Sequence, residues 1–156
     1  MRRGILIDPS AAEAMSCAAS QSLPHETGGI LVGHYEDKSL VVTHAIVIQA
    51  DVLSRDRYTR DDLQANAALK MYLQGREQED PGGYLGEWHS HPGPSGISSI
   101  DTSAIRGLAK EVDTDIALII ISPRQGDRLA GALTSRNRKG RITSSRAVIT
   151  MIPSTH

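Results

Sequence analysis

The segment GEWHSHPGPSGISSID, residues 86–101, decides the fold because it joins a strand pattern to a helix pattern. Residues 84–91, YLGEWHSH, predict a strand that ends at two histidines, and the glycines and prolines that follow predict a loop. A helix is predicted from about Asp101 to Glu111. A strand that leads through a short loop into a helix is typical of an α/β domain.

Short apolar runs alternate with helical patterns over the rest of the chain, which predicts an α/β fold with a mixed β-sheet flanked by helices. The predicted strands cover residues 4–7, 28–36, 39–50, 84–91, 116–121, 127–136 and 140–152, and the predicted helices cover 9–20, 61–78 and 101–111. The run IALIII at 116–121 predicts a strand buried on both faces. The last two strands predict a closing hairpin, and residues 51–60 predict a polar loop. With 156 residues, the whole chain 1–156 is expected to form one domain.

Two of the predicted helices indicate which of their faces packs against the sheet. Asp8 followed by Pro9 predicts a helix start, because a carboxylate caps free backbone N–H groups and proline suits the first turn. The apolar positions expected to face the core are Ala11, Met15 and Ala19 in the first helix and Leu63, Ala67 and Met71 in the second. Cys17, the only cysteine, is expected to pack in the core.

Charge and composition argue against several classes of protein. The formal net charge of −1 argues against nucleic acid as an obligate partner, because phosphate binding needs a basic field. Seven basic residues and one acidic residue between Arg124 and Arg146 predict a solvated hairpin, with a docking patch as the alternative. No apolar run approaches the roughly 20 residues that span a bilayer, and the N-terminus shows no signal-peptide pattern. We therefore expect a cytoplasmic protein with no membrane partner.

The histidines of the opening segment predict a metal site. In a strand, residues two apart point to the same side, so His89 and His91 project into one space. Asp101 follows a loop that can fold back and supply an oxygen ligand, and three protein ligands with one open position are typical of a catalytic zinc. Two alternatives remain open from spacing alone. The histidines are also compatible with surface or hydrogen-bonded core residues, and Ser98 with Asp101 is compatible with a helix cap.

A second motif, HETGGILVG at residues 25–33, adds to the first a resemblance to a known family. Together, ETGGILVG and GEWHSHP…SxxD resemble the JAMM (MPN+) metalloprotease family, and in particular its compact prokaryotic members. The resemblance covers Glu26 to Asp101 by motif and implies a single MPN domain of the JAB/cytidine-deaminase-like type. One departure is visible: nine residues, Pro92 to Ile100, separate the second histidine from the aspartate, where the family pattern usually has ten.

The resemblance implies a role for each matching residue. His89, His91 and Asp101 match the ligands of one Zn²⁺ per chain, Glu26 matches the general acid/base, and Ser98 matches the residue that supports the tetrahedral intermediate. Glu26 would accept a proton from the attacking water and return it to the departing amine. Gly28 and Gly29 have a structural interpretation, since they let the backbone approach closely beside Glu26. Trp88 is expected in the core, on the side of the strand opposite the histidines.

Family resemblance also implies a substrate class. Such enzymes remove ubiquitin or ubiquitin-like modifiers from conjugates or trim the C-terminal tails of modifiers, and small bacterial ones resemble peptidases encoded beside E1-like and E2-like enzymes. Two alternatives stay open: a non-catalytic MPN scaffold, and a nuclease or DNA-repair-associated JAB relative. All five matching residues are present, which argues against the scaffold, and the near-neutral charge argues against the nuclease.

Overall fold

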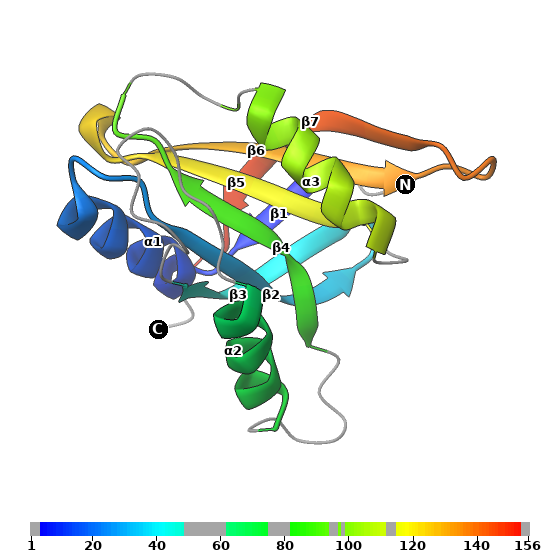
Figure 1. Ribbon diagram of the computed structural model, residues 1–156, viewed down its shortest axis with the longest axis horizontal. Coiled ribbons are helices and arrows are strands. Elements are labelled where there is room, and N and C mark those ends of the chain that lie inside the picture. The colour runs from blue at the N-terminus through cyan, green and yellow to red at the C-terminus, as the bar shows by residue number, and fades with distance from the viewer. Residues whose placement is uncertain are drawn as a thin grey trace.

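The computed structural model describes residues 4–48, 62–74, 82–93, 97, 99–111 and 115–153, and at 99–101 and 111 it describes the backbone only. Its elements are β1 (Gly4–Ile7), α1 (Pro9–Ser22), β2 (Gly28–Glu36), β3 (Ser39–Val47), α2 (Asp62–Gln74), β4 (Gly83–Ser90), α3 (Ser99–Glu111), β5 (Ile116–Ser122), the 3-10 helix η1 (Pro123–Gln125), β6 (Arg128–Arg136) and β7 (Ile142–Met151) (Figure 1). Each strand and helix predicted from the sequence is therefore confirmed within the described residues, which do not include 49–50, 61 and 75–78 of the predicted ranges. The predicted loop at 51–60 lies outside the described residues. Among the described helices, none has the length and apolar character that crossing a membrane requires.

The sheet is mixed, as predicted, but it closes on itself. Its strand order is β1-β3-β2-β4-β5-β6-β7, and β1 completes the circle by pairing in parallel with both β3 and β7. The pair β4–β5 is also parallel, whereas β2 pairs antiparallel with β3 and β4, and β6 pairs antiparallel with β5 and β7. The α/β class is confirmed, and the mixed sheet flanked by helices is refined to a closed barrel with helices packed against it.

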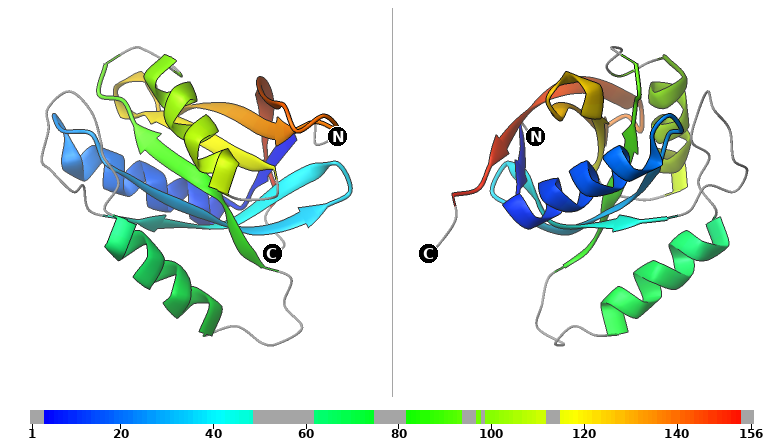
Figure 2. Two further views of the ribbon diagram at one scale, coloured as in Figure 1. Left: turned by 45° about the vertical axis from the view of Figure 1, so that its right-hand side comes forward. Right: turned by 90° about the vertical axis from the view of Figure 1, so that its left-hand side faces the viewer.

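The three helices cover different parts of the barrel. In the right-hand view of Figure 2, α1 lies across one end of the closed sheet, where its buried residues join the central core. Outside the barrel, α3 packs on the outward-facing residues of β5 through Ile105 and Ala109. Helix α2 packs through Ala65 on outward-facing residues of β2. The carboxyl ends of β4 and β5 lie between α1 and α3 (Figures 1 and 2).

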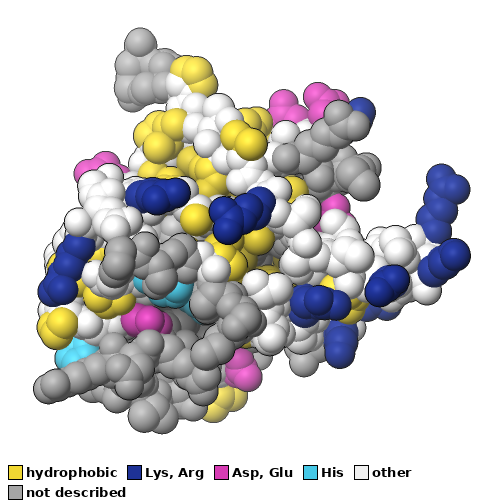
Figure 3. Space-filling view, turned by 90° about the horizontal axis from the view of Figure 1, so that it is seen from above, with side chains coloured by type: hydrophobic (Ala, Val, Ile, Leu, Met, Phe, Trp, Pro, Cys, Tyr) yellow, Lys and Arg dark blue, Asp and Glu magenta, His cyan; other side chains and the backbone are white. Residues whose placement is uncertain are grey.

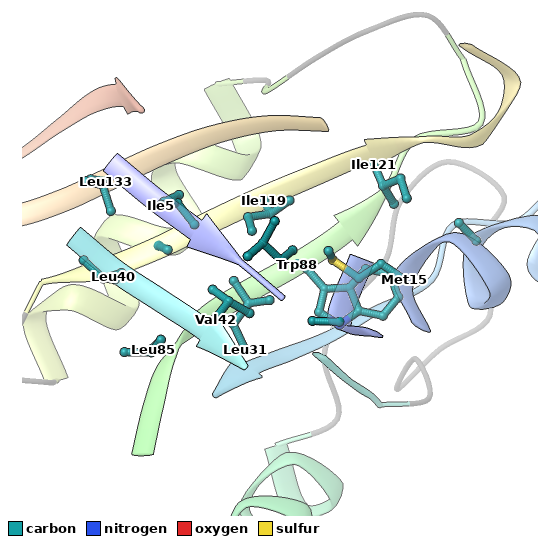
Figure 4. Packing of buried hydrophobic residues seen from close by; sticks show 14 residues of the cluster. Ile5, Met15, Leu31, Leu40, Val42, Leu85, Trp88, Ile119, Ile121 and Leu133 are labelled. Atoms are coloured by element: carbon teal, nitrogen blue, oxygen red, sulfur yellow. The ribbon is translucent and has the colours of Figure 1, made fainter. Parts of the chain in front are cut away.

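Strand β5 contributes side chains to two hydrophobic clusters, one inside the barrel and one outside it. All seven of its residues are buried, as the sequence predicted. Ala117, Ile119 and Ile121 point into the barrel, where Trp88 and Met15 complete the central cluster (Figure 4). Ile116, Leu118 and Ile120 belong to the separate cluster beneath α3. Side chains that alternate along a strand covered on both faces are mostly apolar, which is why the run 116–121 shows no polar alternation.

Helix α1 begins as its sequence predicts. The carboxylate Oδ1 of Asp8 accepts a hydrogen bond from the Ser10 amide at 2.9 Å and from the Ser10 hydroxyl at 2.7 Å. Ala11, Met15 and Ala19 form the buried face, which confirms the prediction for this helix. The prediction for Cys17 is wrong, because its thiol is exposed. At 100° per residue, a position two beyond Met15 lies on the opposite side of the helix from the buried face.

The predicted face of α2 is also wrong. Leu63 and Met71 are 83% and 73% exposed, and Ala67 is exposed with them. The face that packs on the barrel consists of Ala65, Ala68, Leu69 and Tyr72. Both sets follow a helical spacing, so periodicity alone could not choose between them. The choice was made by the outward-facing residues of β2, Ile30 and Val32, which meet the small side chain of Ala65.

Candidate active site

The two histidines of the opening segment lie at the carboxyl end of β4. Because β4 and β5 are parallel, this end lies beside the end of β5, and the His91 amide donates a hydrogen bond of 2.9 Å to the Ile121 carbonyl. His89 is half-buried, and His91 is only 7% exposed. Trp88, which alternates with the histidines, is fully buried inside the barrel, as predicted. The alternation therefore directs His89 to the outer side of the sheet.

A reciprocal pair of hydrogen bonds holds the segment of Glu26 against the histidine segment. The Thr27 amide donates to the Ser90 hydroxyl Oγ at 2.8 Å, and the Ser90 amide donates to the Thr27 carbonyl at 2.8 Å. This pair continues the antiparallel register of β2 and β4, in which Gly28 lies opposite His89. Glu26 directly precedes Thr27 and His91 directly follows Ser90, so the two segments lie next to each other here. The segments of Glu26 and of the two histidines, which are far apart in the sequence, are thereby neighbours at one end of the barrel.

The loop that carries Glu26 is well anchored. Glu26 and His25 are both half-buried. The His25 amide donates to the Ser22 carbonyl at 2.8 Å, which joins the loop to the last turn of α1. The buried Nδ1 atom of His25 has no hydrogen-bond partner among the described residues. Helix α1 and strand β4 thus fix the two ends of this loop.

Gly29 has the structural role expected of it. A side chain at this position would collide with the Ile46 carbonyl of β3 and with the indole nitrogen of Trp88. That indole nitrogen donates to the same carbonyl at 3.2 Å. A residue without a side chain therefore lets β2 approach β3 closely next to the Glu26 loop.

Three residues near the histidines were not singled out from the sequence. Ser90 and Thr27 make the paired hydrogen bonds, and Glu87 is a buried acid, 3% exposed, two residues before His89. The Tyr84 hydroxyl donates a hydrogen bond of 2.6 Å to the Oε2 atom of Glu87. Alternation within EWHSH could have indicated that Glu87 shares the histidine face. No local signal could have shown the contact between Thr27 and Ser90, because it depends on strand pairing.

The other two predicted residues are only partly described. Asp101 lies in the first turn of α3, where the structure describes its backbone, and Ser98 lies outside the described residues. Among the described side chains, a set that does not include Asp101, no three His, Cys, Asp or Glu groups come together as a metal site. The two imidazoles at one strand end suit a zinc ion by their chemistry.

The histidines of β2 and β3 have other surroundings. His34 Nε2 lies 3.5 Å from the Glu36 carboxylate, and the ring of His44 contacts that of Tyr72 edge-on, with centroids 5.5 Å apart. Figure 3 shows histidine and acidic side chains close together on one face, with basic and hydrophobic side chains beyond them.

Comparison with known proteins identifies the family and a similar fold. Residues 8–134 match the family of prokaryotic homologs of the JAB domain. Protein DSY2949 from Desulfitobacterium hafniense has a similar solution structure, with a TM-score of 0.70 and 21% sequence identity over 96% of this chain and 94% of that chain. At this identity the likeness concerns the fold. No curated protein matches the chain.

The class of protein follows from the barrel, the motifs and the family match taken together. The chain belongs to the prokaryotic JAB-domain family. Its matched region covers α1 through most of β6, and so includes Glu26, both histidines and α3.

Proposed function

We propose that the protein is a zinc-dependent metallopeptidase that hydrolyses peptide or isopeptide bonds of ubiquitin-like modifiers. The observation that supports the proposal is the hydrogen-bonded pair of Thr27 and Ser90, because Thr27 directly follows Glu26 and Ser90 separates the two histidines. A carboxylate next to two imidazoles on one sheet edge provides a general base and metal ligands within one site. His89, His91 and Asp101 would hold the zinc.

Each residue of the chain has a distinct task in this proposal. Bound zinc would lower the pKa of the attacking water and polarise the substrate carbonyl. Glu26 accepts the proton of that water and later returns it to the departing amine. The Ser98 hydroxyl donates a hydrogen bond to the oxygen that becomes negatively charged in the transition state. His91 is only 7% exposed, so neighbouring residues restrict its side chain.

The substrate we propose is a ubiquitin-like protein, either joined to a target or carrying an unprocessed C-terminal tail. An extended tail can bind along a strand edge through backbone hydrogen bonds and so present its last peptide bond to the site. E1-like and E2-like enzymes of the same conjugation system are proposed partners, and the cytoplasm is the proposed location.

The test is to measure zinc content and hydrolysis on the same purified protein. One zinc per chain and cleavage of a linear ubiquitin-like fusion are expected, and a nuclease assay run beside it is expected to be negative. Replacing both His89 and His91 with Ala should abolish both zinc and hydrolysis. A matched control replaces His34 and His44, which lie elsewhere in the sheet, and should retain both.

Zinc retained by the His89→Ala, His91→Ala protein would refute the ligand assignment. A protein that binds zinc but cleaves neither a fusion nor an isopeptide conjugate would instead favour the non-catalytic scaffold.

A further inference from the structure

A groove of about 530 Å³ opens beside the candidate active site, where β6 and β7 separate. Ser122, the last residue of β5, lines its near end, and the preceding residue, Ile121, accepts the hydrogen bond from the His91 amide. Ile97, on the segment that leads from the histidines to α3, lines the same end. The groove therefore begins next to the histidine pair.

The two arginines of the groove lie on the same face of the sheet as His89. His89 pairs with Ile120 of β5, Ile120 pairs with Ala130 of β6, and Ala132 of β6 pairs with Arg146 of β7. Paired residues point to the same side, and so do residues two apart along a strand. Arg128 and Arg146, which both line the groove, are thus on the outer side with His89. Arg128 is the first residue of β6, and β6 lies two strands away from β4, which corresponds to about 10 Å.

One edge of β6 is open along this groove. Every residue of β6, Arg128–Arg136, has a partner in β5 or β7, but β7 pairs with β6 only from Gly131 to Arg136. From Val148 onward β7 pairs instead with β1. No described strand therefore pairs with Arg128–Ala130 on the side facing β7. Backbone N–H and C=O groups on an open strand edge can bind an extended peptide.

The polar character of the groove identifies the peptide that it would take. Its described lining includes two exposed arginines, Arg128 and Arg146, and the amide of Gln125, and it contains no acidic residue. The nearby Asp127 points elsewhere, since its carboxylate accepts a hydrogen bond of 2.7 Å from Ser16 of α1. Leu129 and Ile149 supply apolar surface on the inner side of the groove, where they pack against the central cluster. Guanidinium groups bind carboxylates through paired hydrogen bonds, which favours acidic side chains.

We propose that this groove binds an extended acidic segment of the polypeptide substrate while the scissile bond lies at the histidines. Carboxylates of the segment contact Arg128 and Arg146, and its backbone pairs with the open edge of β6. Calling the segment part of the substrate rests on the proposed peptidase function, whereas binding of the acidic peptide does not. A binding experiment in which no bond is cleaved therefore separates the two proposals.

The experiment uses the full chain with a chelator present and a short fluorescent peptide in which threonine alternates with glutamate. Fluorescence anisotropy should show saturable binding that weakens as salt is raised, because the contacts are between exposed charges. Arg128→Ala or Arg146→Ala alone should weaken binding by about three- to fivefold, and the double substitution by about tenfold or more. The control is Arg138→Ala with Arg141→Ala, which removes the same charge from exposed positions in and beside the β6–β7 turn, outside the groove.

Equal weakening by the control pair would overturn the proposal, because it would show that only the overall charge matters. Equal binding of a peptide with glutamine in place of glutamate would overturn it as well. Tighter, Arg128-dependent binding of a single-stranded oligonucleotide would assign the groove to nucleic acid instead. If the acidic peptide binds as expected but the protein hydrolyses nothing, the groove stands and the peptidase proposal fails.

Discussion

Thr27 and Ser90 exchange two hydrogen bonds of 2.8 Å, one through the Ser90 side chain and one through its backbone. Ser90 is fully buried, and it stands between the two histidines in the sequence. Thr27 directly follows Glu26. The proposed base and the proposed ligands are therefore aligned by residues that need not touch a substrate.

Replacing Ser90 with Ala should misalign Glu26 and the histidines. The change leaves the buried Thr27 amide without its acceptor, which should lower the free energy of unfolding by about 1–3 kcal/mol. We expect kcat for peptide hydrolysis to fall while zinc content is kept. Ser90→Thr retains the hydroxyl and is the control, so it should keep most of the activity. If Ser90→Ala lowers only stability, measured by urea unfolding, the alignment role is wrong.

Replacing Glu26 with Gln should separate zinc binding from hydrolysis. The amide keeps the size of the side chain but cannot accept a proton, so turnover should fall at least about 10²-fold. Zinc content and the unfolding midpoint should stay near those of the native protein. The substitution should also trap a complex with an uncleaved conjugate. Near-native peptidase activity in this protein would show that Glu26 is not the base.

Ser98→Ala distinguishes a catalytic hydroxyl from a helix cap. If the hydroxyl stabilises the transition state, kcat should fall by about 10²- to 10³-fold with little loss of stability. If Ser98 only caps α3, the protein should lose about 1 kcal/mol of stability and keep its activity. Measuring turnover and thermal unfolding on the same protein decides between these two results.

Asp8 should make part of the free energy of unfolding depend on pH. The hydrogen bonds from the Ser10 hydroxyl and the Ser10 amide hold the pKa of the Asp8 carboxyl below its ordinary value. A lowered folded pKa means that the stabilisation is complete above the unfolded pKa, about 3.9, and is lost as pH falls through the folded pKa. Asp8→Asn keeps a capping side chain without this titration.

Unfolding of the Asp8→Asn protein, followed by urea titration at several pH values, should therefore depend less steeply on pH below about 4 than that of the native protein. Asp8→Ala removes the cap as well and should cost about 1 kcal/mol near neutral pH. Identical acid profiles for the native and Asn proteins would contradict the linkage.

Gly29→Ala should be strongly destabilising, because its methyl group would meet the Ile46 carbonyl and the Trp88 indole. We expect a loss of at least about 3 kcal/mol, the upper end of the cost of overpacking. Gly107→Ala is the control, since a methyl group there meets open space on exposed α3. Helix propensity predicts that this control gains roughly 0.5–1 kcal/mol. Urea unfolding of both proteins tests the difference.

Local sequence determined the elements of this protein. Asp8 and Pro9 start α1, the apolar spacing of Ala11, Met15 and Ala19 defines its buried face, and the run 116–121 defines a strand buried on both sides. Each of these features depends on neighbours within a few residues, so it can be predicted from capping, periodicity and propensity. The same holds for His89, whose side of the strand follows from alternation with Trp88.

Tertiary structure decided how those elements meet. The sequence contains two possible apolar faces on α2, and only the contact of Ala65 with β2 selected one of them. It also contains no local sign that β1 pairs with β7 and closes the barrel, or that Thr27 pairs with Ser90. The physical reason is that backbone hydrogen bonds between strands are nearly independent of residue type. Register is therefore set by how all the buried side chains pack together.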